Sequence, residues 1–283
     1  SGSAVIGSYE FHSGIDFVRI PGVVKQIETG EYDSANLRVG VEHTLEMRTR
    51  IIKDTADIYR PDLFIVDKEP MGLKGEVEET LAFLKTHGTT LVLGLREVMD
   101  SPHLLDAEWK RKNVMPKIGQ FYDNIWVYGP REFYDPLVGL DVPEAVRSKM
   151  NFVGFLQRSV SRGERPDHRP KGEYLLVTTG GGGDGADLVN DVMRAYQRDP
   201  TLQHKALVVL GPYMPAKQRR KLMRRSESIP CLEVIEFDNR MEELVAGATA
   251  VVAMGGYNTY CEILSFDKPA LIVPRVQPRE EQL

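Results

Sequence analysis

The stretch from Val251 to Gln282 reads VVAMGGYNTYCEILSFDKPALIVPRVQPREEQ. An apolar run ends in Gly255-Gly256, a short amphipathic segment follows, and a second apolar run from Ala270 to Val273 ends at Pro274. This order predicts a strand, a glycine turn, a helix and a second strand, which form one βαβ unit. Ligands of open parallel sheets bind outside the carboxyl ends of the strands. We therefore expect a ligand site at this turn.

The polar residues of this stretch suit a nucleotide sugar. Glycines let the backbone approach a ligand closely, and N–H groups at the expected helix start, near Asn258 and Thr259, suit a phosphate. Glu262 follows one turn later and can accept hydrogen bonds from a sugar diol, and Glu281-Gln282 follow the second strand. The structural alternative is an N-cap with an acid that the helix dipole favours. The combination of these residues favours a binding site.

Length and composition limit the classes of protein. A chain of 283 residues, 42% hydrophobic and 27% charged, is typical of a globular protein with two domains. The net charge of −5 argues against a dedicated nucleic-acid binder. The two cysteines, Cys231 and Cys261, lack metal-ligand spacing, and no apolar run approaches the roughly 20 residues that span a bilayer. We expect a cytoplasmic protein whose sequence is truncated at both ends.

Apolar runs alternate with helical patterns along the whole chain, which predicts α/β domains with mostly parallel sheets. Further strands are expected at 15–20, 63–67, 90–95, 124–129, 150–156, 174–179, 205–211 and 234–237, and helices at 37–59, 75–87, 104–122, 186–197, 215–225 and 241–248. Residues 158–173 are rich in charge, proline and glycine and are expected to be a linker. It separates an N-terminal domain, 1–157, from a C-terminal domain, 174–283.

A tetraglycine follows the strand expected at 174–179 and precedes a helix. Its residues are Gly180, Gly181, Gly182 and Gly183. Their N–H groups can face a phosphate or a ligand of the other domain, although a flexible βα turn is the alternative.

A basic run lies in the helix expected at 215–225. Its cations are Lys217, Arg219, Arg220, Lys221, Arg224 and Arg225. A solvated helix face and a patch for anionic lipid headgroups, or for a phosphate-bearing acceptor, are both open interpretations.

Carboxylates follow two strands of the first half. Asp67, Glu69 and Glu97 are candidates for a general base that deprotonates an acceptor hydroxyl, and structural ion pairs are the alternative. The six histidines show no metal spacing, so no metal ligand is predicted. The GxSxG and GxxxxGK[ST] motifs are absent, which argues against the commonest hydrolases and NTPases.

The chain resembles the MurG-like glycosyltransferases, which have two Rossmann-like domains facing each other across a cleft (GT-B). The resemblance is carried by VTTGGGGDG, EFDNRMEELVAGATAVVAMGGYNTYCE and PRVQPREEQ in the second half. RPDLFIVDKEPMGLKGE, LGLREVMD and WVYGPREFYDP in the first half resemble uncharacterised bacterial glycosyltransferases more loosely. The resemblance implies that the second domain binds a nucleotide-sugar donor and the first an acceptor.

The family also implies roles for matching positions. By this resemblance, the diphosphate is held by Gly255, Gly256, Asn258 and Thr259, and the ribose is bound by Glu262. The donor sugar is contacted by Glu281 and Gln282, and the uracil ring is flanked by Phe237 and Met241. Gly180 to Gly183 face the cleft. Met254 departs from the pattern, because the best-known member of the family, which adds N-acetylglucosamine to lipid I, has an arginine before its glycine. The first strand, the N-terminal glycine-rich loop and the C-terminal helix of the family are also missing.

The expected activity is inverting transfer of a sugar from a nucleotide sugar, a UDP-sugar by the resemblance, without metal or other cofactor. The acceptor is left open between a lipid-linked compound and a small molecule, with the protein cytoplasmic or peripheral to the inner face of the membrane. The alternatives are a non-hydrolysing UDP-sugar 2-epimerase and a non-catalytic nucleotide-sugar-binding protein.

Overall fold

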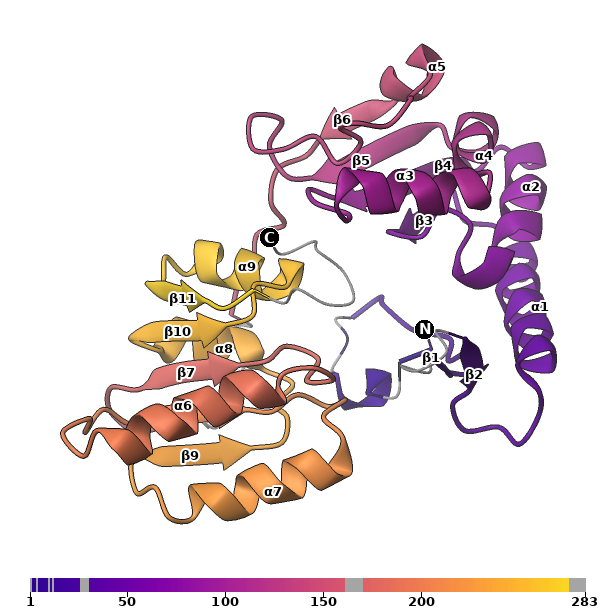
Figure 1. The fold of residues 1–283 in the computed structure, drawn as a ribbon. Helices are drawn as coiled ribbons and strands as arrows, with labels where there is room; N and C mark the ends of the chain where they lie inside the picture. The colour runs from indigo at the N-terminus through magenta and orange to yellow at the C-terminus, as the bar shows by residue number, and fades with distance from the viewer. Residues whose placement is uncertain are drawn as a thin grey trace. The chain divides into compact units, whose positions relative to one another are not determined.

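The computed structural model describes residues 2–3, 5–9, 11, 13–25, 31–160 and 170–274 (Figure 1). The chain divides into two compact units, Ser1–Gly154 and Phe155–Leu283. This division falls slightly before residue 157, where the sequence analysis ends the first domain.

The first unit is built on a four-stranded parallel sheet in the order β3-β4-β5-β6. Its strands are β3 (Leu63–Asp67), β4 (Thr90–Arg96), β5 (Asn124–Tyr128) and β6 (Met150–Phe152). Strand β4 is buried from Leu91 to Leu95 because it has a neighbour on each side, whereas Leu63 and Ile65 of the edge strand β3 are exposed. The prediction of parallel strands here is confirmed.

Helices pack against this sheet through one continuous hydrophobic core. They are α1 (Val41–Tyr59), α2 (Glu78–Thr86), α3 (Pro102–Arg111), α4 (Val114–Phe121) and the short α5 (Glu144–Arg147), with 3-10 turns η1 (Ile6–Ser8) and η2 (Leu73–Gly75). The prediction of one helix over 104–122 is wrong. Asn113 has φ 50°, and this left-handed conformation cannot continue a right-handed helix. The break lets Trp109 of α3 and Ile118 of α4 both reach the core.

The prediction of a strand at 15–20 is also wrong. The residues alternate in polarity, but Ile15 is 56% exposed and Val18 is 47% exposed, and no other described strand pairs with them. An extended segment gains no ladder of hydrogen bonds without a neighbour. The strands nearby are β1 (Val23–Lys25) and β2 (Tyr32–Ser34), which pair antiparallel with each other.

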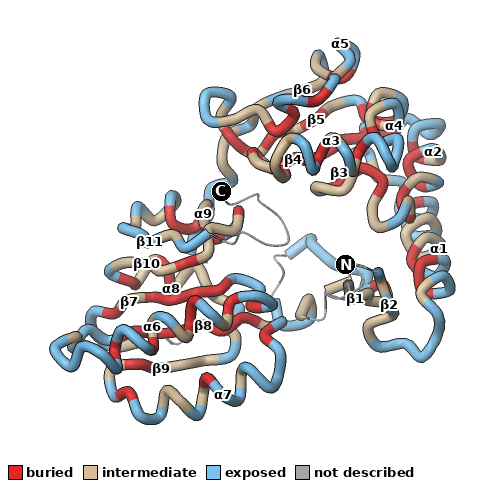
Figure 2. Tube along the Cα trace, in the orientation of Figure 1, coloured by how far each residue is buried: buried red, intermediate tan, exposed pale blue. Residues whose placement is uncertain are grey.

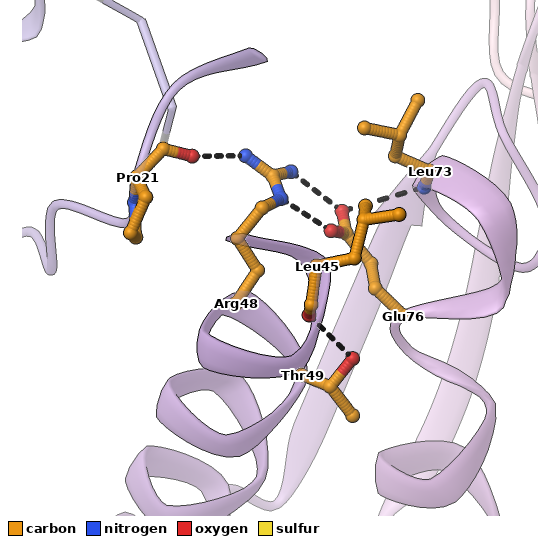
Figure 3. Close-up of polar contacts among 6 residues, drawn as sticks. All are labelled: Pro21, Leu45, Arg48, Thr49, Leu73 and Glu76. Atoms are coloured by element: carbon orange, nitrogen blue, oxygen red, sulfur yellow. Dashed lines mark hydrogen bonds and ion pairs between the residues drawn. The ribbon is translucent and has the colours of Figure 1, made fainter. Parts of the chain in front are cut away.

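A buried ion pair between α1 and the segment before α2 also holds the N-terminal segment at Pro21 (Figure 3). Arg48 of α1 donates to Glu76 through Nε at 2.5 Å and Nη2 at 2.6 Å, and its Nη1 donates to the Pro21 carbonyl at 2.7 Å. Glu76 also accepts a hydrogen bond from the Leu73 N–H at 3.3 Å. Because both side chains are less than a tenth exposed, each depends on the other to satisfy its charge.

The second unit contains a five-stranded parallel sheet in the order β11-β10-β7-β8-β9. Its strands are β7 (Leu175–Thr178), β8 (Ala206–Val209), β9 (Leu232–Ile235), β10 (Ala250–Ala253) and β11 (Ala270–Ile272). The chain runs from β7 outward to β8 and β9 and then returns to β10 on the other side of β7. The strand order therefore reverses between β7 and β10, and such a switch point is where open α/β sheets bind ligands.

Two helical layers cover this sheet. The helices are α6 (Ala186–Arg198), α7 (Ala216–Ser226), α8 (Met241–Gly247) and α9 (Tyr257–Ser265). Successive strand residues point to opposite faces, so Val208 packs in a core with α6 and α7, while Leu207 packs with α8 and α9. Figure 2 shows the inner strand β8, which lies between β7 and β9, buried along its length. Within the described part of the chain, no helix combines the length and apolar character that crossing a membrane requires.

Candidate functional site

The turn between β10 and α9 places two glycines, which have no side chains, at the switch point of the sheet. Gly255 has φ +78°, and a Cβ there would lie 2.8 Å from Cγ2 of Ile272, so only glycine fits without rearrangement. Gly256 is the N-cap of α9 and offers no side chain to the first N–H groups of the helix. Those groups therefore remain available to an anion, as a phosphate requires.

Glu262 is a buried carboxyl on α9, one turn beyond that helix start. Its residue is 8% exposed. Burial and the nearby Glu242 at the start of α8 raise the pKa of Glu262 to about 7, against the opposing effect of Arg158. Thr259 on the same helix is also buried, whereas Asn258 is exposed. The site therefore combines a buried carboxyl with the uncapped N–H groups of a helix start.

Arg158 belongs to this site, although it lies within the linker expected from the sequence at 158–173. Its Nη2 donates to the Asn258 side-chain oxygen at 2.9 Å, and its backbone N–H donates to Oγ of Ser265 at 2.9 Å. Its Nε is buried and has no hydrogen-bond partner among the described residues. Arg158 thus brings a cation to the first turn of α9, close enough to Glu262 to lower its pKa.

The residues before Arg158 are also docked on α9. The Leu156 N–H donates to Oη of Tyr257 at 3.3 Å, and the ring of Phe155 meets that of Tyr260 edge to face, with centroids 5.4 Å apart. The apolar run at 150–156 was the available sequence signal for this docking. The docked segment continues to Arg158, but the charged residues that follow the apolar run made this continuation look like part of the linker.

The tetraglycine lies at the same edge, because β7 and β10 are adjacent. Gly182 has φ +86°, and a Cβ there would lie 2.2 Å from the Leu210 carbonyl oxygen. Gly211 likewise has φ +83°, and its Cβ would lie 2.4 Å from the Gly180 oxygen. The loops after β7 and β8 are therefore in direct backbone contact, which only glycine permits. Gly183 has open space around it and needs no glycine for packing.

The structure describes two of the four other residues that the sequence predicts to contact the donor. Phe237 follows β9 at the carboxyl edge of the sheet and is half-buried. Met241 begins α8 and packs against the core that α8 shares with α9. Glu281 and Gln282 lie outside the described residues.

Asp67 lies at the carboxyl end of β3 in the first unit and is exposed. Its register partner on β4 is Gly94, and a Cβ on Gly94 would lie 2.0 Å from Oη of Tyr128. The Tyr128 ring therefore lies over Gly94, and burial together with the charge of Asp67 raises the pKa of its phenol. Asp67 and Tyr128 are thus brought together across β4.

The other two candidate bases have different surroundings. Glu69 lies 3.7 Å from Nζ of Lys112 in a half-exposed ion pair. Glu97 is buried, 8% exposed, and its Cβ would be 2.6 Å from a Cβ built on Gly129. Asp67 and Glu69, but not Glu97, line a largely apolar groove of about 650 Å³ along β3 and α1. No cluster of His, Cys, Asp or Glu able to hold a metal ion occurs among the described residues.

Known proteins share part of this sequence and the fold of the chain. Residues 175–283 match the model of the glycosyltransferase family 28 C-terminal domain. No curated protein matches the chain in sequence. Many solved structures share its fold.

Three of these structures illustrate the likeness. A UDP-glucosyltransferase from Polygonum tinctorium is 15% identical, with TM-score 0.55, and the match covers 96% of this chain and 69% of that protein. The S. aureus MnaA-UDP structure is 11% identical, with TM-score 0.56, covering 87% and 65%. A putative UDP-N-acetylglucosamine 2-epimerase from Listeria monocytogenes is 12% identical, with TM-score 0.52, covering 86% and 64%.

The chain spans 64 to 69% of the length of these three proteins. At such identities the likeness establishes the fold, and the family match covers residues 175–283 of the second unit. The resemblance found in the sequence is confirmed at the level of the fold: the chain folds like GT-B glycosyltransferases, and its residues 175–283 match the glycosyltransferase family 28 C-terminal domain.

Proposed function

We propose that the chain is a glycosyltransferase that moves a sugar from a nucleotide sugar, specifically a UDP-sugar, to an acceptor hydroxyl. The observation that carries this proposal is the buried Glu262, one turn into a helix whose uncapped start lies at the switch point of the sheet. In a nucleoside diphosphate, the ribose diol needs a carboxyl as hydrogen-bond acceptor, and the adjacent diphosphate needs a set of N–H donors. The family 28 match over the same residues supports the assignment.

In this proposal the second unit binds the donor. The turn at Gly255-Gly256 and the first N–H groups of α9, with Asn258 and Thr259, hold the diphosphate. Arg158 adds the positive charge that Met254 does not provide. The ribose is bound by Glu262, the uracil is flanked by Phe237 and Met241, and the sugar is contacted by Glu281 and Gln282.

The chemistry is a single displacement. The acceptor oxygen attacks the anomeric carbon while the bond from that carbon to the diphosphate oxygen breaks, which inverts the configuration. The nucleoside diphosphate leaves with the bonding electrons, and the helix N–H groups and Arg158 stabilise its charge without a metal.

A carboxylate of the first unit takes the acceptor proton. Glu69 is engaged with Lys112 and Glu97 is buried, so the exposed Asp67 is the favoured base.

A thermal-shift panel of UDP-, GDP- and TDP-sugars tests donor binding. A ligand at 100 times its Kd should stabilise the protein by about 2.7 kcal/mol, and UDP-sugars should give the largest shift. No shift with any nucleotide sugar would contradict the proposal.

Incubation with UDP-N-acetylglucosamine alone, followed by NMR, separates the alternatives on this fold. Epimer formation without acceptor would identify a 2-epimerase. Binding without epimerisation, hydrolysis or transfer to any acceptor would identify a non-catalytic nucleotide-sugar-binding protein.

A further inference from the structure

Helix α7 presents a stripe of four cations on its outer face. The stripe consists of Lys217, Arg220, Lys221 and Arg224, all exposed. At 3.6 residues per turn these positions fall within an arc of about 100°. Leu222, which is 1% exposed, marks the opposite face that packs on the unit. Figure 2 shows the exposed outer side of α7.

The two other basic residues of α7 are bound to the unit. Arg219 forms an ion pair with Glu236 at 3.0 Å. Arg225 donates to the side-chain oxygens of Asn190 at 2.8 Å and Gln197 at 2.6 Å. Arg219 and Arg225, on either side of the stripe, are therefore held in place. The four cations of the stripe have no ion-pair or hydrogen-bond partner within the described ranges.

Other exposed helices of this protein pair their cations with acids one turn away. Arg50 pairs with Glu46, Lys110 with Asp106 and Lys112 with Glu108. Oppositely charged residues four positions apart stabilise a helix face that is simply exposed to solvent. Helix α7 has no acidic residue at all, so its charges repel one another unless an external anion compensates them.

We propose that this stripe binds an anionic lipid surface. A basic residue near such a surface strengthens membrane binding about fivefold, so the four cations of the stripe favour an anionic surface locally, although the whole chain has a net charge of −5. The stripe follows a single straight helix face, which meets a planar surface along its length. It carries no aromatic residue on which a nucleic-acid base could stack. A membrane is thus favoured over a polynucleotide.

Co-sedimentation with vesicles tests the proposal. The parent protein should bind phosphatidylcholine vesicles that contain a third of phosphatidylserine at least about tenfold better than pure phosphatidylcholine vesicles, in about 0.1 M salt. Binding should disappear near 0.5 M salt, where charges are screened. The variant carrying Lys217→Gln, Arg220→Gln, Lys221→Gln and Arg224→Gln should lose this preference.

A second variant provides the matched control. It carries Arg50→Gln, Lys53→Gln, Lys110→Gln and Lys112→Gln, which removes the same number of positive charges from helices where each is paired. This control should bind anionic vesicles like the parent. The proposal is overturned if the parent shows no preference for anionic vesicles, if both variants lose it equally, or if duplex DNA binds the stripe more tightly than the vesicles do. Circular dichroism of all three proteins establishes that each is folded.

Discussion

Nη2 of Arg158 lies 2.9 Å from the side-chain oxygen of Asn258 and donates a hydrogen bond to it. This contact joins the segment that begins the second unit to the first turn of α9. It also places a guanidinium beside the helix start that we assign to the diphosphate. In the proposed function, Arg158 supplies the positive charge that the uncharged Met254 does not provide.

Substitution of Arg158 should weaken nucleotide binding. Arg158→Ala removes a charged donor and is expected to cost about 1.5–3 kcal/mol in UDP affinity, as measured by calorimetric titration. Arg158→Lys should recover part of the loss because it keeps the charge. The control is Arg198→Ala, an exposed arginine at the end of α6. If Arg158→Ala binds UDP as tightly as the parent does, Arg158 has no role in the site.

Glu262 should make stability depend on pH. Its pKa is about 7 in the folded protein and near 4.5 when unfolded. Between these values the unfolded chain loses the proton while the folded chain keeps it, so stability falls as pH rises through this window. Below about pH 4 the group has no effect, and above about pH 7 the full cost applies, on the order of 3 kcal/mol.

Urea unfolding of the parent and of Glu262→Gln between about pH 4 and pH 8 measures this dependence. The neutral amide does not titrate, so the variant should gain stability relative to the parent as pH rises. A constant difference across the range would show that Glu262 is not buried as described.

The buried pair of Arg48 and Glu76 should be essential to the first unit. Glu76→Gln leaves a buried guanidinium without its counter-charge, and unfolding free energy should fall by about 3–5 kcal/mol. Glu46→Gln, which breaks the exposed pair with Arg50, should cost less than about 1 kcal/mol. Equal costs for the two substitutions would show that the buried pair contributes no more than a surface one.

Two glycines of the tetraglycine should respond differently to substitution by alanine. Gly182→Ala forces a Cβ onto the Leu210 oxygen at positive φ and should destabilise the protein by more than about 2 kcal/mol. Gly183→Ala meets open space and should be close to neutral. Thermal unfolding of both variants measures the difference. Similar melting temperatures would mean that the two loops are not in contact.

Much of the fold follows from the sequence because the patterns are local. Buried parallel strands such as β4 and β8 read as continuous apolar runs, and glycine turns mark where several of them end. The break between α3 and α4 could not be found this way, since Asn113 adopts the left-handed conformation without a glycine or proline to signal it. The extended segment at 15–20 has the polarity of a strand, but pairing depends on a neighbour that local sequence does not reveal.

The donor site is predictable for a similar reason. Gly255, Gly256 and Glu262 lie within a few residues of one another, so one βα turn gathers them. Arg158 lies about a hundred residues earlier, and only the tertiary fold brings it to Asn258. The relation between Asp67 and Tyr128 likewise depends on Gly94, a strand residue whose importance is steric and becomes visible only in three dimensions.

Calorimetric titration of UDP into the parent protein and into Glu262→Ala tests whether α9 forms the nucleotide site. We predict that the parent binds UDP, and that the variant binds it more weakly by about 1.5–3 kcal/mol, the range for hydrogen bonds to a charged group. Equal affinity in the two proteins, or a parent that does not bind UDP, would contradict the assignment of α9 as the nucleotide site.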